Sequence, residues 1–166
     1  MPKHAPQVAG IAKQLHPRLF YGLSREEYAD LARTSQFFFV YEVEGEVVGF
    51  VLGYTDKDWL TQKPNWLDEV EWDTPHSSEI IEKERFFLYD QVGVKPEWQG
   101  KHIATKLYRR LELLARKAEF KRMFAEIQLS PYLNEYSIKW HEGRGFAPVG
   151  TRDDQGVRWR IFVKYL

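Results

Sequence analysis

The chain of 166 residues contains no cysteine. Disulfides, thiolate metal sites and a covalent acyl-cysteine intermediate are therefore excluded. No apolar run approaches the length of a membrane span, and the N-terminus lacks the apolar core of a signal peptide. We therefore expect a cytoplasmic protein that does not bind membranes. The formal net charge is zero, which gives no general argument for nucleic-acid binding.

The five histidines, at positions 4, 16, 76, 102 and 141, show no spacing typical of metal ligands. We therefore expect no metal. The hydrophobic fraction of 43% and the aromatic fraction of 16% predict a folded protein rather than a disordered one. The length suits a single domain over residues 1–166.

Charge is unevenly distributed along the chain. Residues 95–122 contain nine Lys and Arg against three Glu, whereas residues 55–84 contain nine Asp and Glu against three Lys. Solvated surfaces would explain both blocks. The functional alternative is a basic side for a polyanionic cofactor and an acidic side for a cationic substrate.

A strand, a tight turn and a helix occupy the middle of the chain. Phe86–Val94 is rich in aromatic and β-branched residues, and Pro96, which has no N–H to donate to a ladder, follows it. Apolar residues then recur with helical spacing over Ile103–Ala118. Backbone amides near Gly100 would lie unpaired at the helix N-terminus, where an anion can bind them. Many such turns bind nothing, so this stretch alone leaves both interpretations open.

Two ordered motifs, one at residues 94–107 and one at residues 134–146, resemble motifs of the GNAT family of N-acetyltransferases. Residues 94–107, VKPEWQGKHIATKL, are similar to the family's acyl-CoA-binding motif, with Gln99 at its first position and Ala104 at its last. Residues 134–146, NEYSIKWHEGRGF, are similar to the family's Asn-x-x-(Ala/Ser)-x-x-Phe-Tyr-x-x-x-Gly-Phe helix. Two motifs at the expected spacing are more specific than either one alone. The resemblance covers Phe37 to Tyr165.

The resemblance implies an α/β fold whose mixed, mostly antiparallel sheet contains a splayed parallel strand pair and is flanked by helices. The strand–helix–strand order from Phe86–Val94 to Arg122–Leu129 independently predicts a parallel pair. Residues 56–84, usually a short turn in relatives, form an acidic, tryptophan-rich insertion. Its tryptophans should pack over something. The insertion is either a lid or wall over the acceptor site, or a decorative subdomain or dimer contact.

Local patterns predict the other elements. Helical spacing predicts a helix over Gln7–Leu19, and a capping box from Ser24 to Glu27, with a hydrophobic staple between Leu23 and Tyr28, starts a second helix that runs to about Thr34. The remaining elements are a hairpin of Phe37–Val43 and Val47–Tyr54, a short helix over Asn134–Glu142, and two final strands joined by a turn at Thr151–Gly156.

The resemblance implies that acetyl-CoA is the cosubstrate and that its pyrophosphate rests on the amides of the turn. The pantetheine arm would lie like an added strand along the backbone of Val92 and Val94. Asn134 can be a helix N-cap, a pantetheine contact or both. The residues implied in cofactor binding are Val92, Val94, Gln99, Gly100, Lys101, His102, Ile103, Ala104, Thr105 and Asn134.

His102 departs from the family pattern, which has a glycine at this position. Glycine suits a positive φ or a close approach to phosphate, and histidine tolerates such a position less well. The alternative is a turn with right-handed geometry that places the imidazole near the phosphates.

His141 and Asp90 are the candidate catalytic residues. His141 falls where relatives commonly have a tyrosine as general acid for the departing thiolate, and the alternative is a helix-face histidine with no catalytic role. Asp90 lies on the central strand, where some relatives keep a carboxylate that deprotonates the amine through water. The alternative for Asp90 is a strand-end carboxylate bonded to a neighbour. Tyr89 and Glu84 are weaker candidates for the base.

We therefore expect an acetyl-CoA-dependent N-acetyltransferase that modifies a primary amine by direct attack in a ternary complex, because no cysteine can accept the acetyl group. The acidic insertion favours a small cationic acceptor such as a polyamine or an amino sugar. One alternative is a protein Nα- or Lys-acetyltransferase, which would need an open peptide groove. Another is a non-catalytic acyl-CoA-binding or sensor domain. The sequence leaves a homodimer open.

Overall fold

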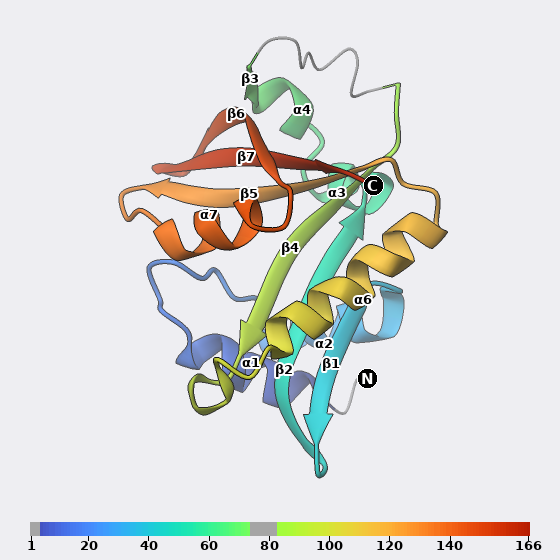
Figure 1. The fold of residues 1–166 in the computed structure, drawn as a ribbon, viewed down its shortest axis with the longest axis vertical. Helices are drawn as coiled ribbons and strands as arrows, with labels where there is room; N and C mark the ends of the chain where they lie inside the picture. Colours follow the sequence, from blue (N-terminus) through green and yellow to red (C-terminus); the bar gives the residue numbers. More distant parts are fainter. Residues whose placement is uncertain (1–3, 74–82) are drawn as a thin grey trace. The chain divides into compact units, whose positions relative to one another are not determined.

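Seven strands form a mixed sheet in the computed structural model, which describes residues 4–73 and 83–166. The strand order is β1-β2-β4-β5-β7-β6-β3 (Figure 1). The strands are β1 (Phe38–Val43), β2 (Glu46–Thr55), β3 (Glu71–Trp72), β4 (Phe86–Val94), β5 (Arg122–Ser130), β6 (Ala147–Asp154) and β7 (Val157–Tyr165). The helices are α1 (Ala5–Gln14), α2 (Arg25–Thr34), α3 (Asp56–Gln62), α4 (Trp66–Glu69), the 3-10 turn η2 (Pro96–Trp98), α6 (Ile103–Lys117) and α7 (Glu135–Glu142).

The strand pairing confirms the expected mixed sheet. β1 with β2, β5 with β7, β6 with β7 and β3 with β6 are antiparallel. β4 and β5 are parallel, and their ladder pairs Phe86–Leu88 with Arg122–Phe124. β4 then continues to Val94.

The chain divides into two compact units, each with its own buried side chains. The first unit comprises the chain up to Gly53 together with Asp90–Leu114, and the second comprises Tyr54–Tyr89 together with Ala115–Leu166. Whether the whole chain acts as one domain stays a prediction.

In the first unit, α2 begins where the sequence predicts it, whereas α1 begins at Ala5 and not at the predicted Gln7. Ser24 Oγ accepts a hydrogen bond from Glu27 N at 3.2 Å, and Ser24 N donates to Glu27 Oε2 at 2.7 Å, so the capping box of α2 is confirmed. α1 ends at Gln14 and not at Leu19, because Leu15 has extended backbone. A proline at position 17 further disfavours helix in the residue before it.

The tryptophans of the insertion belong to the core of the second unit. Trp66 is fully buried, and its ring centroid lies 5.5 Å from that of Phe86 and 5.8 Å from that of Phe124. Trp59 is buried against Trp66, with ring centroids 6.3 Å apart. The prediction that these side chains pack against other residues is confirmed. Residues 74–82 of the insertion, including His76, lie outside the described residues.

The predicted turn at Thr151–Gly156 is too long. Thr151–Asp154 belong to β6, and Gln155 and Gly156 alone make the connection, both with positive φ. A two-residue turn of this kind matches the twist of paired antiparallel strands. Pattern analysis missed it because four polar residues in a row at 151–154 look like a loop.

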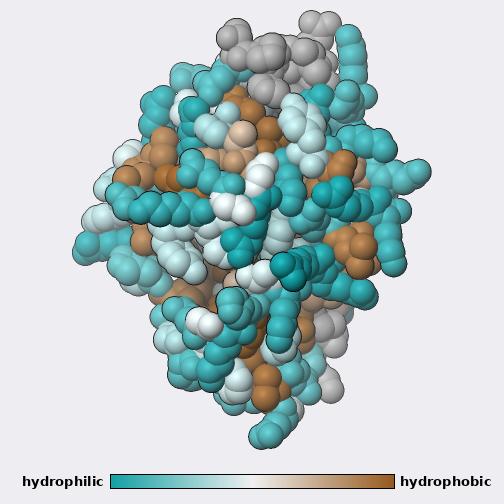
Figure 2. Space-filling view, viewed as in Figure 1, coloured by the Kyte–Doolittle hydropathy of each residue, from teal (hydrophilic) through white to brown (hydrophobic). Residues whose placement is uncertain are grey.

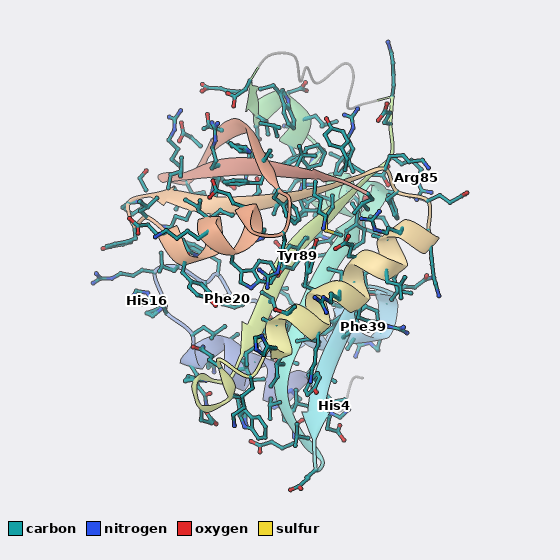
Figure 3. All side chains as sticks on the ribbon, viewed as in Figure 1. His4, His16, Phe20, Phe39, Arg85 and Tyr89 are labelled. Carbon is teal, nitrogen blue, oxygen red and sulfur yellow. The ribbon has the colours of Figure 1, made fainter. Side chains whose placement is uncertain are left out.

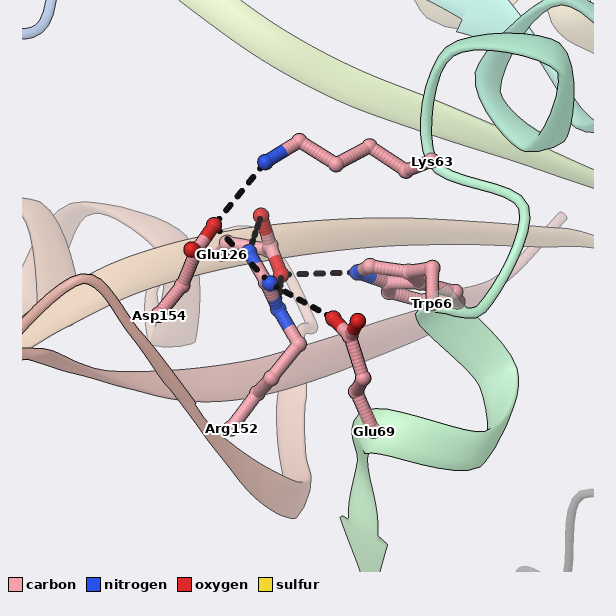
Figure 4. Close-up of polar contacts among 6 residues, drawn as sticks. All are labelled: Lys63, Trp66, Glu69, Glu126, Arg152 and Asp154. Atoms are coloured by element: carbon pink, nitrogen blue, oxygen red, sulfur yellow. Dashed lines mark hydrogen bonds and ion pairs between the residues drawn. The ribbon is translucent and has the colours of Figure 1, made fainter.

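A buried guanidinium ties the insertion to the sheet of the second unit (Figure 4). The Arg152 side chain is 2% exposed; its Nε lies 2.9 Å from Glu126 Oε1, and its Nη1 lies 3.1 Å from both Glu69 Oε2 and Asp154 Oδ2. Lys63 Nζ donates to Asp154 Oδ2 at 2.9 Å, and this bond, with help from Arg152, lowers the pKa of Asp154. Trp66 Nε1 donates to Glu126 Oε1 at 2.8 Å. We call these six residues the Arg152 cluster.

Polar side chains dominate the face of the molecule in Figure 2, where apolar atoms form small, separate groups. The large apolar side chains that are exposed include Tyr21, Leu133 and Tyr136. Within the two described stretches, no helix combines the length and apolar character that crossing a membrane requires.

Replacing Arg152 with methionine should destabilise the protein by about 3 kcal/mol, because Glu126 would keep a largely buried charge without its partner. The measurement is the free energy of unfolding in urea. Arg158→Met is the matched control, since the Arg158 side chain is 43% exposed and its ion pairs with Glu71 and Asp153 should contribute less than about 1 kcal/mol. Equal losses in both variants would contradict a special role for the buried network.

Candidate active site

The turn after β4 has an unusual backbone. Lys95 N donates to Val48 O at 2.9 Å, which holds the end of β4, and Gln99 Nε2 donates to Val94 O at 3.2 Å, which closes the turn. Gly100 then has φ +76° and His102 has φ +60°. α6 begins at the next residue, Ile103.

The right-handed alternative for His102 is therefore wrong. Histidine is one of the few side chains enriched in the left-handed region, although the conformation costs an L-residue roughly 1–2 kcal/mol. A Cβ added at Gly100 would have no heavy atom within 4 Å, so the requirement for glycine there is conformational and not steric. His102 thus has the positive φ that a glycine would adopt more easily at this position.

The turn forms a cradle of donors at the start of α6. Lys106 N donates to His102 O at 3.0 Å, and the amides of the three preceding helical residues have no carbonyl four residues back inside the helix. Lys101 Nζ lies 4.2 Å from the centroid of the Trp98 ring and His102 is exposed, so both add basic groups beside these amides. The donor set suits a phosphate or pyrophosphate.

Val92 and Val94 precede the turn on β4, with Val94 buried and Val92 half-buried. Between them, a Cβ added at Gly93 would lie 2.4 Å from a ring carbon of Phe50. Glycine is therefore required where β4 passes this ring. The valine side chains take part in ordinary packing, as expected, and any contribution to a ligand would come from their backbone.

Asp90 begins the part of β4 in the first unit and is half-buried. Burial raises the pKa of the Tyr28 hydroxyl to about 12, and the charge of Asp90 adds to this shift. The Tyr28 hydroxyl donates to Gln91 Oε1 at 2.8 Å, and Gln91 Nε2 donates to Tyr21 O at 3.2 Å. The chain segment before α2 is thus tied to the residue next to Asp90.

Sequence analysis missed this tie between Tyr28 and Gln91. The staple pattern places Tyr28 against Leu23, and the structure adds a hydrogen bond from Leu23 N to the Tyr28 hydroxyl at 3.2 Å. No local pattern shows the link to Gln91, because the two residues are 63 positions apart in the chain.

In the second unit, α7 places His141 among aromatic rings. The imidazole is 6% exposed. Its ring centroid lies 5.4 Å from that of Tyr89, 5.0 Å from that of Trp140 and 5.1 Å from that of Phe146. Tyr89 projects from β4 (Figure 3). Such surroundings disfavour a charged imidazole.

Hydrogen bonding fixes the tautomer of His141. Its Nδ1 lies 2.7 Å from Ser137 O, and because a carbonyl oxygen only accepts, Nδ1 carries the proton. Burial lowers the pKa of His141 to about 4, the bond to Ser137 opposes this shift, and Arg144 adds to it. At neutral pH the imidazole is therefore uncharged, and its Nε2 accepts rather than donates.

Asn134 is the N-cap of α7, which confirms one of its two expected roles. Its Oδ1 accepts from Ser137 N at 3.1 Å. Ser137 thus contacts both candidate residues of the second unit, Asn134 through its N–H and His141 through its carbonyl. A pantetheine contact by Asn134 stays a prediction.

The two weaker candidates for the base both contact other residues of the second unit. Glu84, a weaker candidate for the base, forms an ion pair with Arg122 at 2.7 Å. Tyr89, the other, packs on the His141 ring.

His4 and His16 lie well apart in the first unit (Figure 3), and residues 4–73 and 83–166 contain no group of three or more His, Asp or Glu that could hold a metal ion.

Arginines of the second unit pair with acidic residues of the insertion. Five carboxylates between positions 56 and 84 take part in these pairs. They are Asp56 with Arg85, Glu69 with Arg152, Glu71 with Arg158, Asp73 with Arg160 and Glu84 with Arg122. Much of the acidic excess is therefore balanced within the unit itself.

A model of the acetyltransferase (GNAT) family matches residues 11–146. The chain belongs to the GNAT family. The expected family is confirmed, and with it an acyl-transfer activity that depends on acetyl-CoA. The match includes the turn and ends at Phe146, the last residue of the second motif.

Solved structures of GNAT proteins share the fold over the whole chain. Ard1 from Thermoplasma volcanium is 16% identical with a TM-score of 0.70, and the match covers 100% of this chain and 93% of that one. Naa20 from Chaetomium thermophilum, solved with a bisubstrate analogue, is 15% identical with a TM-score of 0.71 and coverages of 100% and 84%. yncA from Salmonella typhimurium, a putative acetyltransferase solved with its cofactor acetyl-CoA, is 18% identical with a TM-score of 0.65 and coverages of 100% and 90%. No curated protein matches the sequence.

Gly100→Val should abolish binding of acetyl-CoA, because a β-branched residue resists positive φ and would distort the GNAT turn, whereas His102→Gly should retain it. The measurement is the rise in melting temperature with acetyl-CoA at about a hundred times its dissociation constant. At this concentration, bound ligand adds roughly 2.7 kcal/mol to the free energy of unfolding. Gly45→Val is the matched control, since Gly45 has φ +86° and open space in the β1–β2 turn. It should lose stability but keep the ligand shift, and a shift retained by Gly100→Val would refute the cradle.

The neutral His141 should make stability sensitive to acid. Its pKa is about 4 folded against about 6.5 unfolded, so the unfolded state binds the extra proton between these values and stability falls as pH falls through this window. From pH 7 to pH 5, wild type should lose about 2 kcal/mol relative to His141→Gln, measured by urea unfolding at both pH values. If the difference in unfolding free energy between wild type and His141→Gln were the same at both pH values, the pKa of His141 would not be lowered in the folded protein.

Proposed function

We propose that this GNAT protein acetylates a primary amine of a small molecule, using acetyl-CoA, by direct attack with both reactants bound. The observation that carries the proposal is the donor cradle at Gly100–Ile103, where two left-handed residues lead into the start of α6 and the first helical amides have no carbonyl four residues back inside the helix. This cradle accounts for the polyanionic part of the cosubstrate. The absence of cysteine supports direct attack, because no thiol can carry the acetyl group.

The cofactor residues take three roles in this proposal. The amides of Gly100 to Thr105 hold the pyrophosphate, and Lys101 and His102 contribute positive charge or hydrogen bonds beside it. Gln99 closes the turn through Val94 O and so keeps the amides in place. The backbone of Val92 and Val94, with Asn134, binds the pantetheine arm.

Asp90 is the proposed base for the acceptor amine. A carboxylate that is half-buried keeps contact with water, through which it can take a proton from the incoming ammonium group. The bonds from Gln91 to Tyr28 and Tyr21 fix the strand at the next residue and so limit the movement of Asp90.

We propose that His141 acts as a hydrogen-bond acceptor through Nε2. The sequence-based role, proton donation to the departing thiolate, would require the charged imidazole. With a pKa of about 4, only about one molecule in a thousand carries that charge at pH 7. Burial keeps the imidazole neutral, and the Ser137 bond holds the proton on Nδ1, so that Nε2 is the acceptor.

The acceptor is a small amine in this proposal, with a protein α-amino group as the second candidate. The original argument for a cationic acceptor was the acidic insertion, and five of its carboxylates pair with arginines. The charge of the insertion is thus a poor guide to the acceptor. The second candidate draws support from the likeness to Naa20, which was solved with a bisubstrate analogue, and to the ribosomal-protein-S18-alanine N-acetyltransferase of Escherichia coli.

The test is release of CoA thiol from acetyl-CoA in the presence of glucosamine, 1,4-diaminobutane or a peptide with a free N-terminal alanine, with the acetylated product identified by mass spectrometry. We expect turnover with at least one small amine. Turnover with the peptide alone would favour the second candidate. Binding of acetyl-CoA without turnover of any amine would favour the non-catalytic alternative.

Asp90→Asn should lower kcat by about a hundredfold or more, since general base catalysis typically contributes this much, and should leave the melting shift with acetyl-CoA unchanged. His141→Phe should also lower kcat with little loss of cosubstrate affinity. Asp30→Asn is the matched control, because Asp30 is an exposed carboxylate of the first unit whose side chain is 67% exposed. Unchanged turnover in either test variant would remove that residue from the mechanism.

A further inference from the structure

Gln128 on β5 has an unusual buried amide. The residue is 1% exposed, and neither Nε2 nor Oε1 has a hydrogen-bond partner within residues 4–73 and 83–166. Most buried side-chain polar groups are hydrogen-bonded, and an exception calls for an explanation. An apolar residue of similar size would avoid the cost of burying this amide, so its presence suggests that a partner uses it.

Gln128 lies on the same face of the sheet as the Arg152 cluster. Side chains two positions apart on a strand share a face, and Glu126 of the cluster precedes Gln128 by two positions in a regular part of the ladder. Trp159 is the Cα partner of both Gln128 on β5 and Arg152 on β6, so these three residues form one row across the sheet. The amide is therefore the next polar group beyond Glu126.

The end of β5 also connects Gln128 to the residues proposed for the cofactor. The register with β7 shifts between Gln128 and Ser130, and Gln128 O accepts from Asn134 N at 3.1 Å. Asn134 begins α7, which carries His141. The link to α7 runs through the backbone of Gln128, because His141 contacts Phe162, whose partner Ala125 faces the other side of the sheet.

The chemistry of the amide indicates what kind of group it would bind. The Arg152 cluster uses its charges internally, since Glu126 accepts from both Arg152 and Trp66. A glutamine amide is neutral and offers two donor hydrogens and one acceptor oxygen. It therefore matches a neutral group that both donates and accepts, such as a hydroxyl or an amide, better than it matches a bare ammonium group.

We propose that Gln128 is an acceptor-binding residue, which hydrogen-bonds a hydroxyl or amide group carried by the amine substrate. This inference rests on the proposed function, and it narrows the acceptor class to amines that also bear such a group. An amino sugar carries hydroxyls of this kind, and an amino-acid amide carries the alternative group. A simple diamine carries neither.

The experiment compares wild type, Gln128→Met and Ile127→Met with three amines: glucosamine, alaninamide and 1,4-diaminobutane. Methionine keeps the length of glutamine but cannot form its hydrogen bonds. Ile127→Met is the control, because Ile127 is equally buried on β5 but faces the other side of the sheet. Each variant is also melted with and without acetyl-CoA, so that loss of the cosubstrate site is recognised.

Gln128→Met should melt at the wild-type temperature or above it and keep the shift with acetyl-CoA. Its kcat/KM for glucosamine or alaninamide, whichever wild type uses, should fall about tenfold through KM, the size expected for one lost hydrogen bond. Turnover of 1,4-diaminobutane and the kinetics of Ile127→Met should stay near wild type.

Three results would overturn the proposal. A lower melting temperature for Gln128→Met than for Ile127→Met would mean that the amide has a structural partner in the folded protein. If Gln128→Met and wild type had the same kinetics with every amine, no acceptor would contact the Gln128 amide. Wild-type turnover of 1,4-diaminobutane alone would reject the acceptor class but leave acetyl transfer standing, whereas no turnover of any amine would reject the proposed function as well.

Discussion

Two residues in the left-handed region decide where α6 begins. Gly100 and His102 turn the chain between the end of β4 and Ile103, and the amides that follow have no helical carbonyl to bind. The cost of the conformation at His102 is offset by the packing of α6, whose side chains Ile103, Leu107 and Leu111 are all buried. Burial of the apolar side of α6 thus stabilises the strained turn before it, and this turn places the first amides of α6 where an anion can bind them.

Sequence patterns predicted the elements that local chemistry determines. The capping box at Ser24, the strand Phe86–Val94 and the helix from Ile103 follow from short-range periodicity and caps, and the structure has them within a few residues. Two element bounds were mispredicted. α1 ends earlier than expected, because Leu15 has extended backbone and a proline follows at position 17. β6 is longer than expected, because the polar residues 151–154 look like a loop in the sequence. The mixed sheet was predicted from the family resemblance and the strand–helix–strand order, whereas the order of the seven strands comes from the structure alone.

The candidate site was predictable to the extent that one motif carries it. The turn and Asn134 stand in contiguous motifs, and Asn134 caps α7 as the sequence predicts. The state of His141 was not predictable, because it depends on rings from β4, α7 and β7 and on the Ser137 carbonyl. The bond from Tyr28 to Gln91 and the bare amide of Gln128 also result from tertiary packing, which residue spacing does not reveal. The pairing of the acidic insertion with arginines also depends on tertiary packing, because these arginines follow the insertion in the chain.

The shortest strand affects how the sheet can meet other chains. β3 has two residues, Glu71 and Trp72, and pairs with Thr151 and Gly150 at the outer side of β6. Asp73 N extends this pairing with a bond to Val149 O at 2.8 Å. The exposed ladder positions of β6 are thus partly covered by a segment too short, and too acidic, to template a further strand. A short, acidic edge strand of this kind disfavours edge-to-edge pairing with another chain through this side of the sheet.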